Sequence, residues 1–108
     1  MAHQDTIHIG TTGRAFTDIT GHVAGIVAKS NIGTGIVHLF VRHTSCSLVI
    51  TENADASVRR DLEMLSHRWA PDGDRAYEHR EEGDDDLPGH ALSILGGVSL
   101  SVPINNGR

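Results

Sequence analysis

One short stretch gathers many of the side chains of this chain that could do chemistry. The stretch YEHREEGDDDLPGH, residues 77–90, places His79 and His90 on either side of a run of carboxylates. Their spacing fits no short helical metal motif such as HExxH, so the fold would have to assemble any metal site. Imidazoles from separate loops suit zinc, whose catalytic sites keep three protein ligands and an open position for water.

The acidic residues between these histidines have two readings. In the functional reading, Glu82 acts as a base or outer-shell partner together with one of three aspartates, which are Asp84, Asp85 and Asp86. In the structural reading, a glycine-containing acidic loop faces solvent. Spacing and charge alone favour the solvated loop and leave the roles of the aspartates open.

A second group lies in VRHTSCS, residues 41–47. His43 could supply an acid or base, and Thr44 and Ser45 could bind a phosphate, since hydroxyls and turn amides both bind oxyanions. The competing reading is an ordinary turn with a histidine at the end of a strand, and spacing alone favours it. Cys46 begins an apolar run, so we expect it to be a small buried side chain and not a nucleophile.

A third group, TENADASVRRD, stands where a helix is expected to begin. Carboxylates and amides at a helix amino terminus bind free backbone N–H groups and oppose the helix dipole. Capping therefore explains Glu52, Asn53, Asp55 and Asp61. The alternative directs Asn53 or Asp55 into a cleft, as a ligand or a substrate contact.

Hydrophobic periodicity predicts the elements that must position these groups. Residues 19–30 have the apolar spacing of a helix, and residues 53–71 have the strongest helical pattern, with a cap at Asn53 or Asp55 and a stop at Pro71. Alternating or β-branched runs predict strands, which lie within 6–10, 35–44, 46–53 and 98–104. Between them we expect a polar loop over 72–89 and a short helix or turn over 90–95.

Composition limits the class of protein. A chain of 108 residues forms one small domain. With a net charge of -5 and Lys29 as its single lysine, it has no basic face for nucleic acid. Cys46 alone cannot form an internal disulfide, and no apolar run reaches the roughly 20 residues of a membrane span. With no secretory signal at its start, we expect a protein of the reducing cytoplasm.

Taken in order, the segments GIVHLFVRHTSCSLVITENADASVRRDLE, YEHREEGDDDLPGHALSIL and SLSVPINNGR resemble the YjbQ family, whose members are also called secondary thiamine-phosphate synthase enzymes. The resemblance extends from about residue 6 to the end of the chain. The family pattern has a strand ending in His-Thr-Ser/Thr, then Glu-Asn-Ala-Asp before a helix, a His followed by Glu-Gly, and a His after a Pro-x pair. The matching positions here are His43, Thr44, Ser45, Glu52, Asn53, Ala54, Asp55, His79, Glu82, Gly83 and His90.

The resemblance implies a single domain over residues 1–108, with an α+β fold, a mixed and mostly antiparallel sheet, two main helices and assembly as a homotrimer. It also implies a cleft in which His43, His79 and His90 hold a divalent metal, with zinc as the first candidate. A small phosphorylated ligand would bind there to Thr44, Ser45 and Asn53. The catalytic residues would be His43, Glu82 and Asn53.

The activity implied by the resemblance is a weak joining of a pyrimidine diphosphate to a thiazole phosphate, which gives thiamine phosphate. A cation and the donors of the cleft would neutralise the departing diphosphate. The alternative is a non-catalytic metal- or ligand-binding module. A third reading, a scaffold with a solvated loop, predicts that the imidazoles of His79 and His90 do not come within about 5 Å of each other.

Two features depart from the family pattern. Leu92 stands where many relatives carry a basic residue, so a phosphate contact would be missing. The family also continues after Asn-Gly-Arg with further strands, and we expect these closing strands to be missing here. The sheet edge would then be bare unless a neighbouring subunit covers it.

Overall fold

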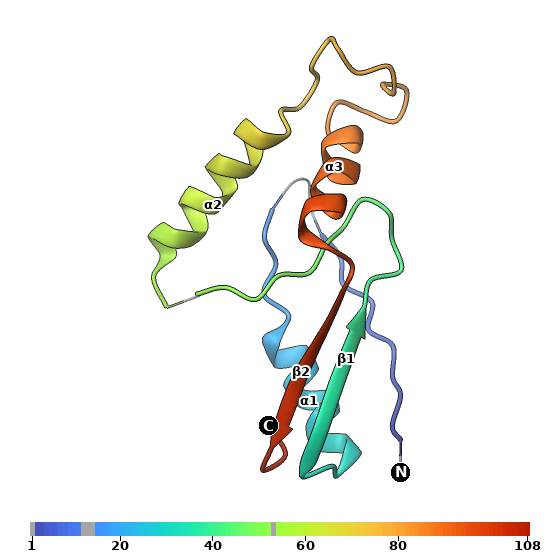
Figure 1. The fold of residues 1–108 in the computed structure, drawn as a ribbon, viewed down its shortest axis with the longest axis vertical. Helices are drawn as coiled ribbons and strands as arrows, with labels where there is room; N and C mark the ends of the chain where they lie inside the picture. The colour runs from blue at the N-terminus through green and yellow to red at the C-terminus, as the bar shows by residue number, and fades with distance from the viewer. Residues whose placement is uncertain (1, 12–14, 53) are drawn as a thin grey trace.

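The computed structural model describes residues 2–11, 15–52 and 54–108. Within them the chain forms three helices and two strands, in the order α1 (Thr20–Ser30), β1 (Thr34–Phe40), α2 (Ala56–Trp69), α3 (Asp86–Gly96) and β2 (Ser99–Asn105). The predicted α+β fold is confirmed, with α3 added to the two helices that were predicted as the main ones. The molecule is elongated, with extents of 50 × 29 × 21 Å (Figure 1).

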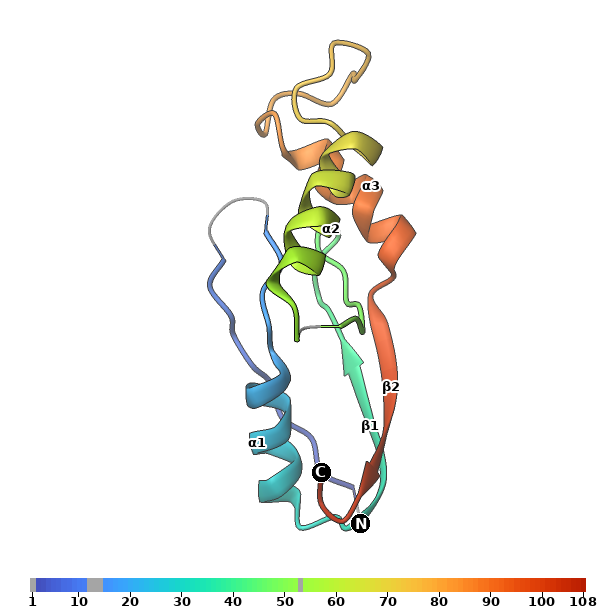
Figure 2. The same cartoon turned by 90° about the vertical axis from the view of Figure 1, so that its left-hand side faces the viewer.

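The two strands form an antiparallel ribbon along the long axis. Their register pairs Ile36 with Pro103 and Phe40 with Ser99. Alternate side chains of β1 are exposed, and α1 lies along the opposite side of the ribbon (Figure 2). Ile36 and Phe40 are 71% and 64% exposed, so the outer face of the ribbon presents apolar side chains to solvent.

The predicted helices over 19–30 and 53–71 are confirmed within a few residues at each end. The C-terminal end of α1 is the left-handed Asn31, with a φ of 58°. Asp55 caps α2 by accepting a hydrogen bond from the Ser57 backbone N–H at 2.9 Å. The helix ends at Trp69, and Pro71 follows two residues later, as a helix stop should.

Two predicted strands are wrong. Residues 6–10 and 46–52 form neither helix nor strand, and Asn53, the last residue of the second predicted strand, lies outside the described residues. The second segment runs beside the end of the ribbon and makes one backbone bond there, from the Leu48 N–H to the Gly97 carbonyl at 3.0 Å. Val49 and Ile50 are 56% and 69% exposed, and this apolar run has no partner strand among the described residues, so its β-propensity does not lead to a hydrogen-bonded ladder there.

The polar loop is present, but it ends earlier than predicted, because α3 begins at Asp86 and not at His90. Pro88 lies in the first turn of α3, where a missing N–H costs nothing. The loop is held together by bonds such as Gly73 N–H to the Asp84 carbonyl, 2.8 Å, and Tyr77 hydroxyl to the Pro71 carbonyl, 2.7 Å.

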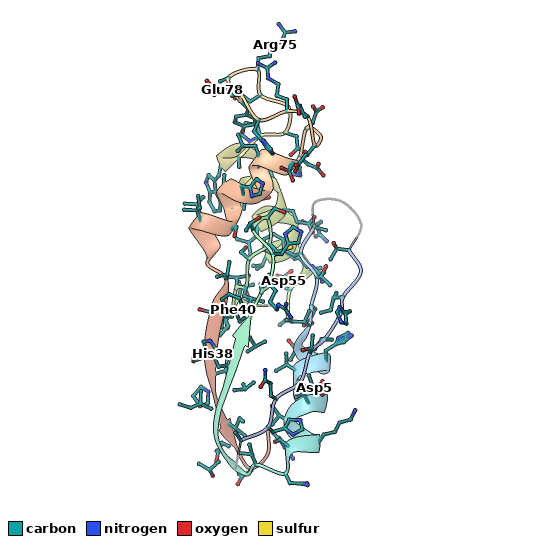
Figure 3. All side chains as sticks on the ribbon, turned by 90° about the vertical axis from the view of Figure 1, so that its right-hand side faces the viewer. Asp5, His38, Phe40, Asp55, Arg75 and Glu78 are labelled. Carbon is teal, nitrogen blue, oxygen red and sulfur yellow. The ribbon has the colours of Figure 1, made fainter. Side chains whose placement is uncertain are left out.

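The loop and the chain start lie toward opposite ends of the molecule. Arg75 and Glu78 mark the loop end, and Asp5 lies toward the other (Figure 3). The buried apolar residues in the described ranges are few and dispersed, and they are Val27, Ala70, Pro88 and Ile104. None of the helices in the described ranges combines the length and the apolar character needed to cross a membrane.

Candidate functional site

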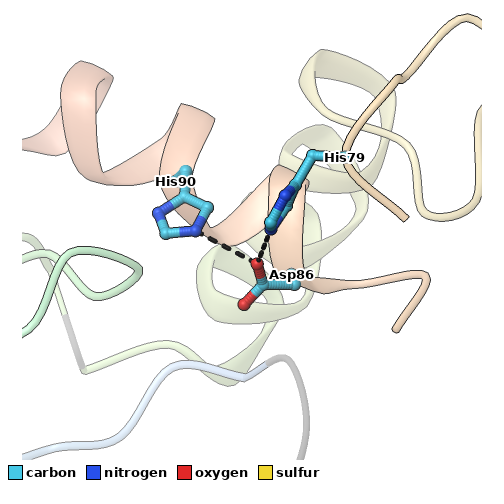
Figure 4. Close-up of side chains that lie close together, drawn as sticks. All are labelled: His79, Asp86 and His90. Atoms are coloured by element: carbon cyan, nitrogen blue, oxygen red, sulfur yellow. Dashed lines mark hydrogen bonds and ion pairs between the residues drawn. The ribbon is translucent and has the colours of Figure 1, made fainter. Parts of the chain in front are cut away.

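The first turn of α3 and the end of the polar loop bring three metal-type ligands together. Asp86 and His90 are four residues apart on α3, so their side chains share one face of the helix. His79 reaches this face from the loop. The Asp86 Oδ2 atom lies 2.7 Å from His79 Nε2 and 3.1 Å from His90 Nε2 (Figure 4).

The three ligand atoms lie within 4.8 Å of one another. The two imidazole rings meet edge to face, with centroids 5.7 Å apart and planes inclined at 63°. The scaffold reading, in which these histidines stay apart, is therefore wrong. Glu82 lies at the margin of the cluster, with its Oε2 3.7 Å from His79 Nε2 and its side chain 67% exposed.

The second ring nitrogen of His90 is fixed by the backbone. His90 Nδ1 lies 2.8 Å from the Thr44 carbonyl oxygen, which can only accept, so Nδ1 carries the proton and donates. This bond is the largest cause that raises the pKa of His90; the Asp86 carboxylate adds to it, and burial opposes it. The hydrogen bond from His79 holds the pKa of Asp86 below its usual value, with the positive charge of His90 adding to the effect.

Two glycines let α3 approach the segment that carries this carbonyl. A Cβ atom at Gly89 would lie 2.9 Å from the Cβ of Ser45 and 3.1 Å from its carbonyl oxygen. A Cβ atom at Gly96 would lie 2.7 Å from the Ser47 hydroxyl oxygen. Contacts this short leave no room for a side chain, so glycine at both positions permits the approach that brings His90 to Thr44.

The structure does not bring His43 into this cluster. Among the described residues, the group of metal-type ligands consists of His79, Asp86 and His90. His43 instead closes its own turn: its Nδ1 accepts from the Ser45 N–H at 3.0 Å and lies 2.9 Å from the Ser45 hydroxyl. Because Nδ1 accepts, a neutral His43 carries its proton on Nε2 and can donate from there.

A hollow of about 580 Å³ lies beside the cluster and shares His90 with it. The segment after β1 lines it with Arg42, His43 and Thr44. Its other walls come from α3 and from the ends of the two strands, with Ser93, Ile94, Phe40, Val41 and Val98. His43, predicted as an acid or base, and Thr44, predicted to bind phosphate, therefore line one concave surface with His90.

The remaining predicted site residues have other places. Asp55 is a helix cap, as the structural reading predicted, and Asn53 lies outside the described residues. Cys46 is exposed, so the prediction of a buried thiol is wrong. Asp86 was one of three undecided aspartates, and its spacing of four residues from His90 is the signal that could have selected it.

Known proteins resemble this chain over nearly its full length. The family model described as "UPF0047 protein YjbQ-like" matches residues 5–108. A UPF0047 protein of Synechocystis is 41% identical over 106 residues, which cover 98% of this chain and 72% of that protein. The UPF0047 protein YjbQ of Escherichia coli O157:H7 is 38% identical over 109 residues, which cover 100% of this chain and 78% of that protein.

Solved structures agree with this assignment. A conserved hypothetical protein of Thermus thermophilus superposes with a TM-score of 0.82 and 33% identity, over 94% of this chain and 76% of that one. An uncharacterised YjbQ/UPF0047 family protein of Clostridium acetobutylicum gives a TM-score of 0.80 and 31% identity, over 93% of this chain and 75% of that one. The chain described here thus belongs to the YjbQ (UPF0047) family.

Proposed function

We propose that this chain is a divalent-metal protein, with zinc as the first candidate, that acts on a small phosphorylated molecule. The metal ligands are His79, Asp86 and His90. The observation that carries the proposal is the convergence of two imidazole nitrogens and one carboxylate oxygen within 4.8 Å. His43 leaves the ligand set and becomes an acid, base or phosphate donor in the neighbouring hollow.

The donor set fits a zinc ion. Imidazole nitrogens and carboxylate oxygens are both zinc ligands, and three of them leave a position for water or substrate. The Thr44 carbonyl fixes the proton of His90 on Nδ1, which leaves Nε2 for a metal. Backbone carbonyls commonly orient metal-binding histidines in this way. A cation would take the place of the hydrogen bonds that Asp86 now makes with the two histidines.

The hollow supports a phosphorylated ligand beside that cation. A bound metal would polarise a phosphoryl oxygen, while the Nε2–H of His43 and the hydroxyl of Thr44 would donate to the phosphate. Glu82, at the margin of the cluster, is the candidate base. The reaction that this arrangement would serve is displacement of a diphosphate, as in a weak thiamine-phosphate synthase activity.

Assembly as a homotrimer belongs to the same proposal. The chain exposes 8224 Å², whereas a compact monomer of 11.6 kDa exposes about 5,800 Å². Apolar side chains contribute to this area, with Ile36, Phe40 and Ile94 all more than half exposed. Contact with neighbouring subunits would remove such surface from water, and light scattering in solution measures the number of chains directly.

Elemental analysis of the untagged protein tests the metal. We expect about one zinc per chain in the wild type, and a loss of most of it in His79→Ala, His90→Ala and Asp86→Asn. His22→Ala is the matched control, because His22 is an exposed histidine on α1 and outside the cluster. Equal zinc in all of these proteins would refute the site.

Incubation with the pyrimidine diphosphate and the thiazole phosphate tests the activity. Product that forms with the wild type and falls at least about tenfold in His43→Ala supports the enzyme, since general acid–base groups contribute at least this much. A protein that holds zinc and makes no product is the non-catalytic binding module.

A further inference from the structure

The hollow beside the metal-type cluster contains a cationic group and a buried hydroxyl that have no partner in the described part of the chain. Arg42 lines the hollow, is exposed, and makes neither a hydrogen bond nor an ion pair with any described residue. Ser93 lines the same hollow from α3 and is 8% exposed. Its hydroxyl makes no hydrogen bond within the described ranges, although buried hydroxyls normally have one.

The neighbouring polar groups do not need these two. His90 already donates from Nδ1 to the Thr44 carbonyl, and its Nε2 faces Asp86. The carboxylate of Asp86, which contacts the lining residue His90, is thus paired with the two histidines. Since the whole chain carries a net charge of -5, an anion would enter the hollow only where a local cation offsets that field.

Beyond Arg42, Ser93 and the polar residues His43, Thr44 and His90, the lining of the hollow is apolar. Phe40 and Ile94 line the hollow and are 64% and 85% exposed, so both offer bare surface for a ligand to cover. A ligand that matches this surface has an anionic group at one end and an apolar body at the other. A guanidinium binds phosphate through two parallel hydrogen bonds, which favours a phosphate over a smaller anion.

We propose that Arg42 and Ser93 form the phosphate subsite of the hollow, for a phosphate ester whose apolar body lies on Phe40 and Ile94. This rests on the proposed function, because it names the groups that recognise its phosphorylated ligand. It makes Arg42 a specificity-determining residue of the chain, separate from the metal-type cluster.

Binding of phenyl phosphate, measured by calorimetry on the full chain before and after EDTA treatment, tests the subsite. Arg42→Gln should weaken binding about tenfold or more, because charge-assisted hydrogen bonds are the stronger ones. Arg42→Lys should fall between the wild type and Arg42→Gln, because lysine keeps the charge but loses the two parallel hydrogen bonds. Inorganic phosphate, which lacks the apolar body, should bind more weakly than phenyl phosphate. Equal affinity of the wild type and Arg42→Gln would overturn the subsite.

Ser93→Ala adds a second readout. If the Ser93 hydroxyl binds the phosphate, its removal should weaken phenyl phosphate binding about threefold. The Tm should stay unchanged or rise, since a buried hydroxyl without a hydrogen-bond partner destabilises the fold. A lower Tm with unchanged binding would make Ser93 purely structural and refute its place in the subsite.

The zinc content of each variant separates this proposal from the previous one. Binding that depends on Arg42 both before and after EDTA treatment would support the subsite, whatever the metal site does. A wild type that holds no zinc as purified would refute the metal site alone. Binding that disappears with EDTA, yet is unchanged in Arg42→Gln, would place the phosphate on the metal and refute the subsite.

Discussion

Replacing Gly89 with alanine tests whether close packing of α3 positions the candidate site. The new Cβ atom would lie 2.9 Å from the Ser45 Cβ, whereas carbon atoms in contact are about 3.5–4.0 Å apart. Helix and segment must therefore separate by roughly 0.6–1.1 Å. The His90–Thr44 hydrogen bond, now 2.8 Å, would lengthen toward about 3.4 Å, where such bonds are weak.

Two effects on stability oppose each other in this variant. Overpacking costs about 1–3 kcal/mol, while alanine in place of glycine within a helix contributes about 1 kcal/mol. The net loss is about 0–2 kcal/mol. Gly25→Ala is the matched control, because Gly25 lies within α1 and its Cβ would meet nothing within 4 Å. That variant should be more stable than the wild type by about 1 kcal/mol.

Thermal unfolding followed by circular dichroism measures this contrast. A gap of about 1–3 kcal/mol between the two variants corresponds to about 4–8 °C in Tm for each kcal/mol in a chain of this size. Zinc affinity, measured by competition with a chelator, should fall about tenfold in Gly89→Ala alone, because its histidine has lost the group that orients it. If Gly89→Ala stabilises the protein as Gly25→Ala does and keeps its zinc affinity, then close packing against Ser45 does not orient His90.

Three further predictions concern charge, metal and capping. The metal-free protein should be most stable between pH 3.8 and pH 6.5, the ordinary pKa values of an aspartate and a histidine side chain. Because the fold lowers the pKa of Asp86, the stabilisation that this carboxylate contributes is lost as the pH falls below the window. Because the fold raises the pKa of His90, the stabilisation that this imidazole contributes is lost as the pH rises above the window. Asp86→Asn should reduce the decline of Tm above pH 6.5 without abolishing it, because the Thr44 carbonyl remains; an unchanged decline would contradict the pairing. Zinc affinity should rise as the pH rises above 6.5, because zinc must displace protons from its ligands, so in the presence of zinc the Tm should not decline there. EDTA should lower the Tm of the zinc-bound wild type but not that of His79→Ala. Asp55→Ala should cost about 1 kcal/mol by urea unfolding through loss of the cap on α2, whereas Asp61→Ala, within the same helix, should cost less.

Local patterns predicted the parts of the fold that depend on local forces. The helix over 53–71 has its own cap at Asp55 and its own stop at Pro71, so its sequence describes it fully. The strand over 98–104 alternates cleanly, and it pairs with β1. The segment 46–50 has the same apolar character but no described partner strand, and a strand's existence depends on a partner that its own residues do not encode.

The candidate site was predicted in part, for a similar reason. His79 and His90 were selected through the family resemblance, while spacing alone favoured a solvated loop. Because Pro88 and Gly89 are typical of a loop, the predicted helix begins at His90, about one turn after the observed start of α3 at Asp86. The prediction therefore missed that Asp86 and His90 lie on one face of the same helix. That the helix approaches Ser45 closely depends on tertiary packing, which no local pattern reports.

His90 contacts the rest of the molecule through both ring nitrogens, and each nitrogen belongs to a different environment. Nε2 faces the metal-type cluster, and Nδ1 donates to Thr44, in the segment after β1 that lines the hollow. The ring cannot turn toward one environment without leaving the other. If a metal binds the cluster and a ligand binds the hollow, we therefore expect their affinities to be linked. Any factor by which the metal changes the affinity for the ligand would then equal the factor by which the ligand changes the affinity for the metal.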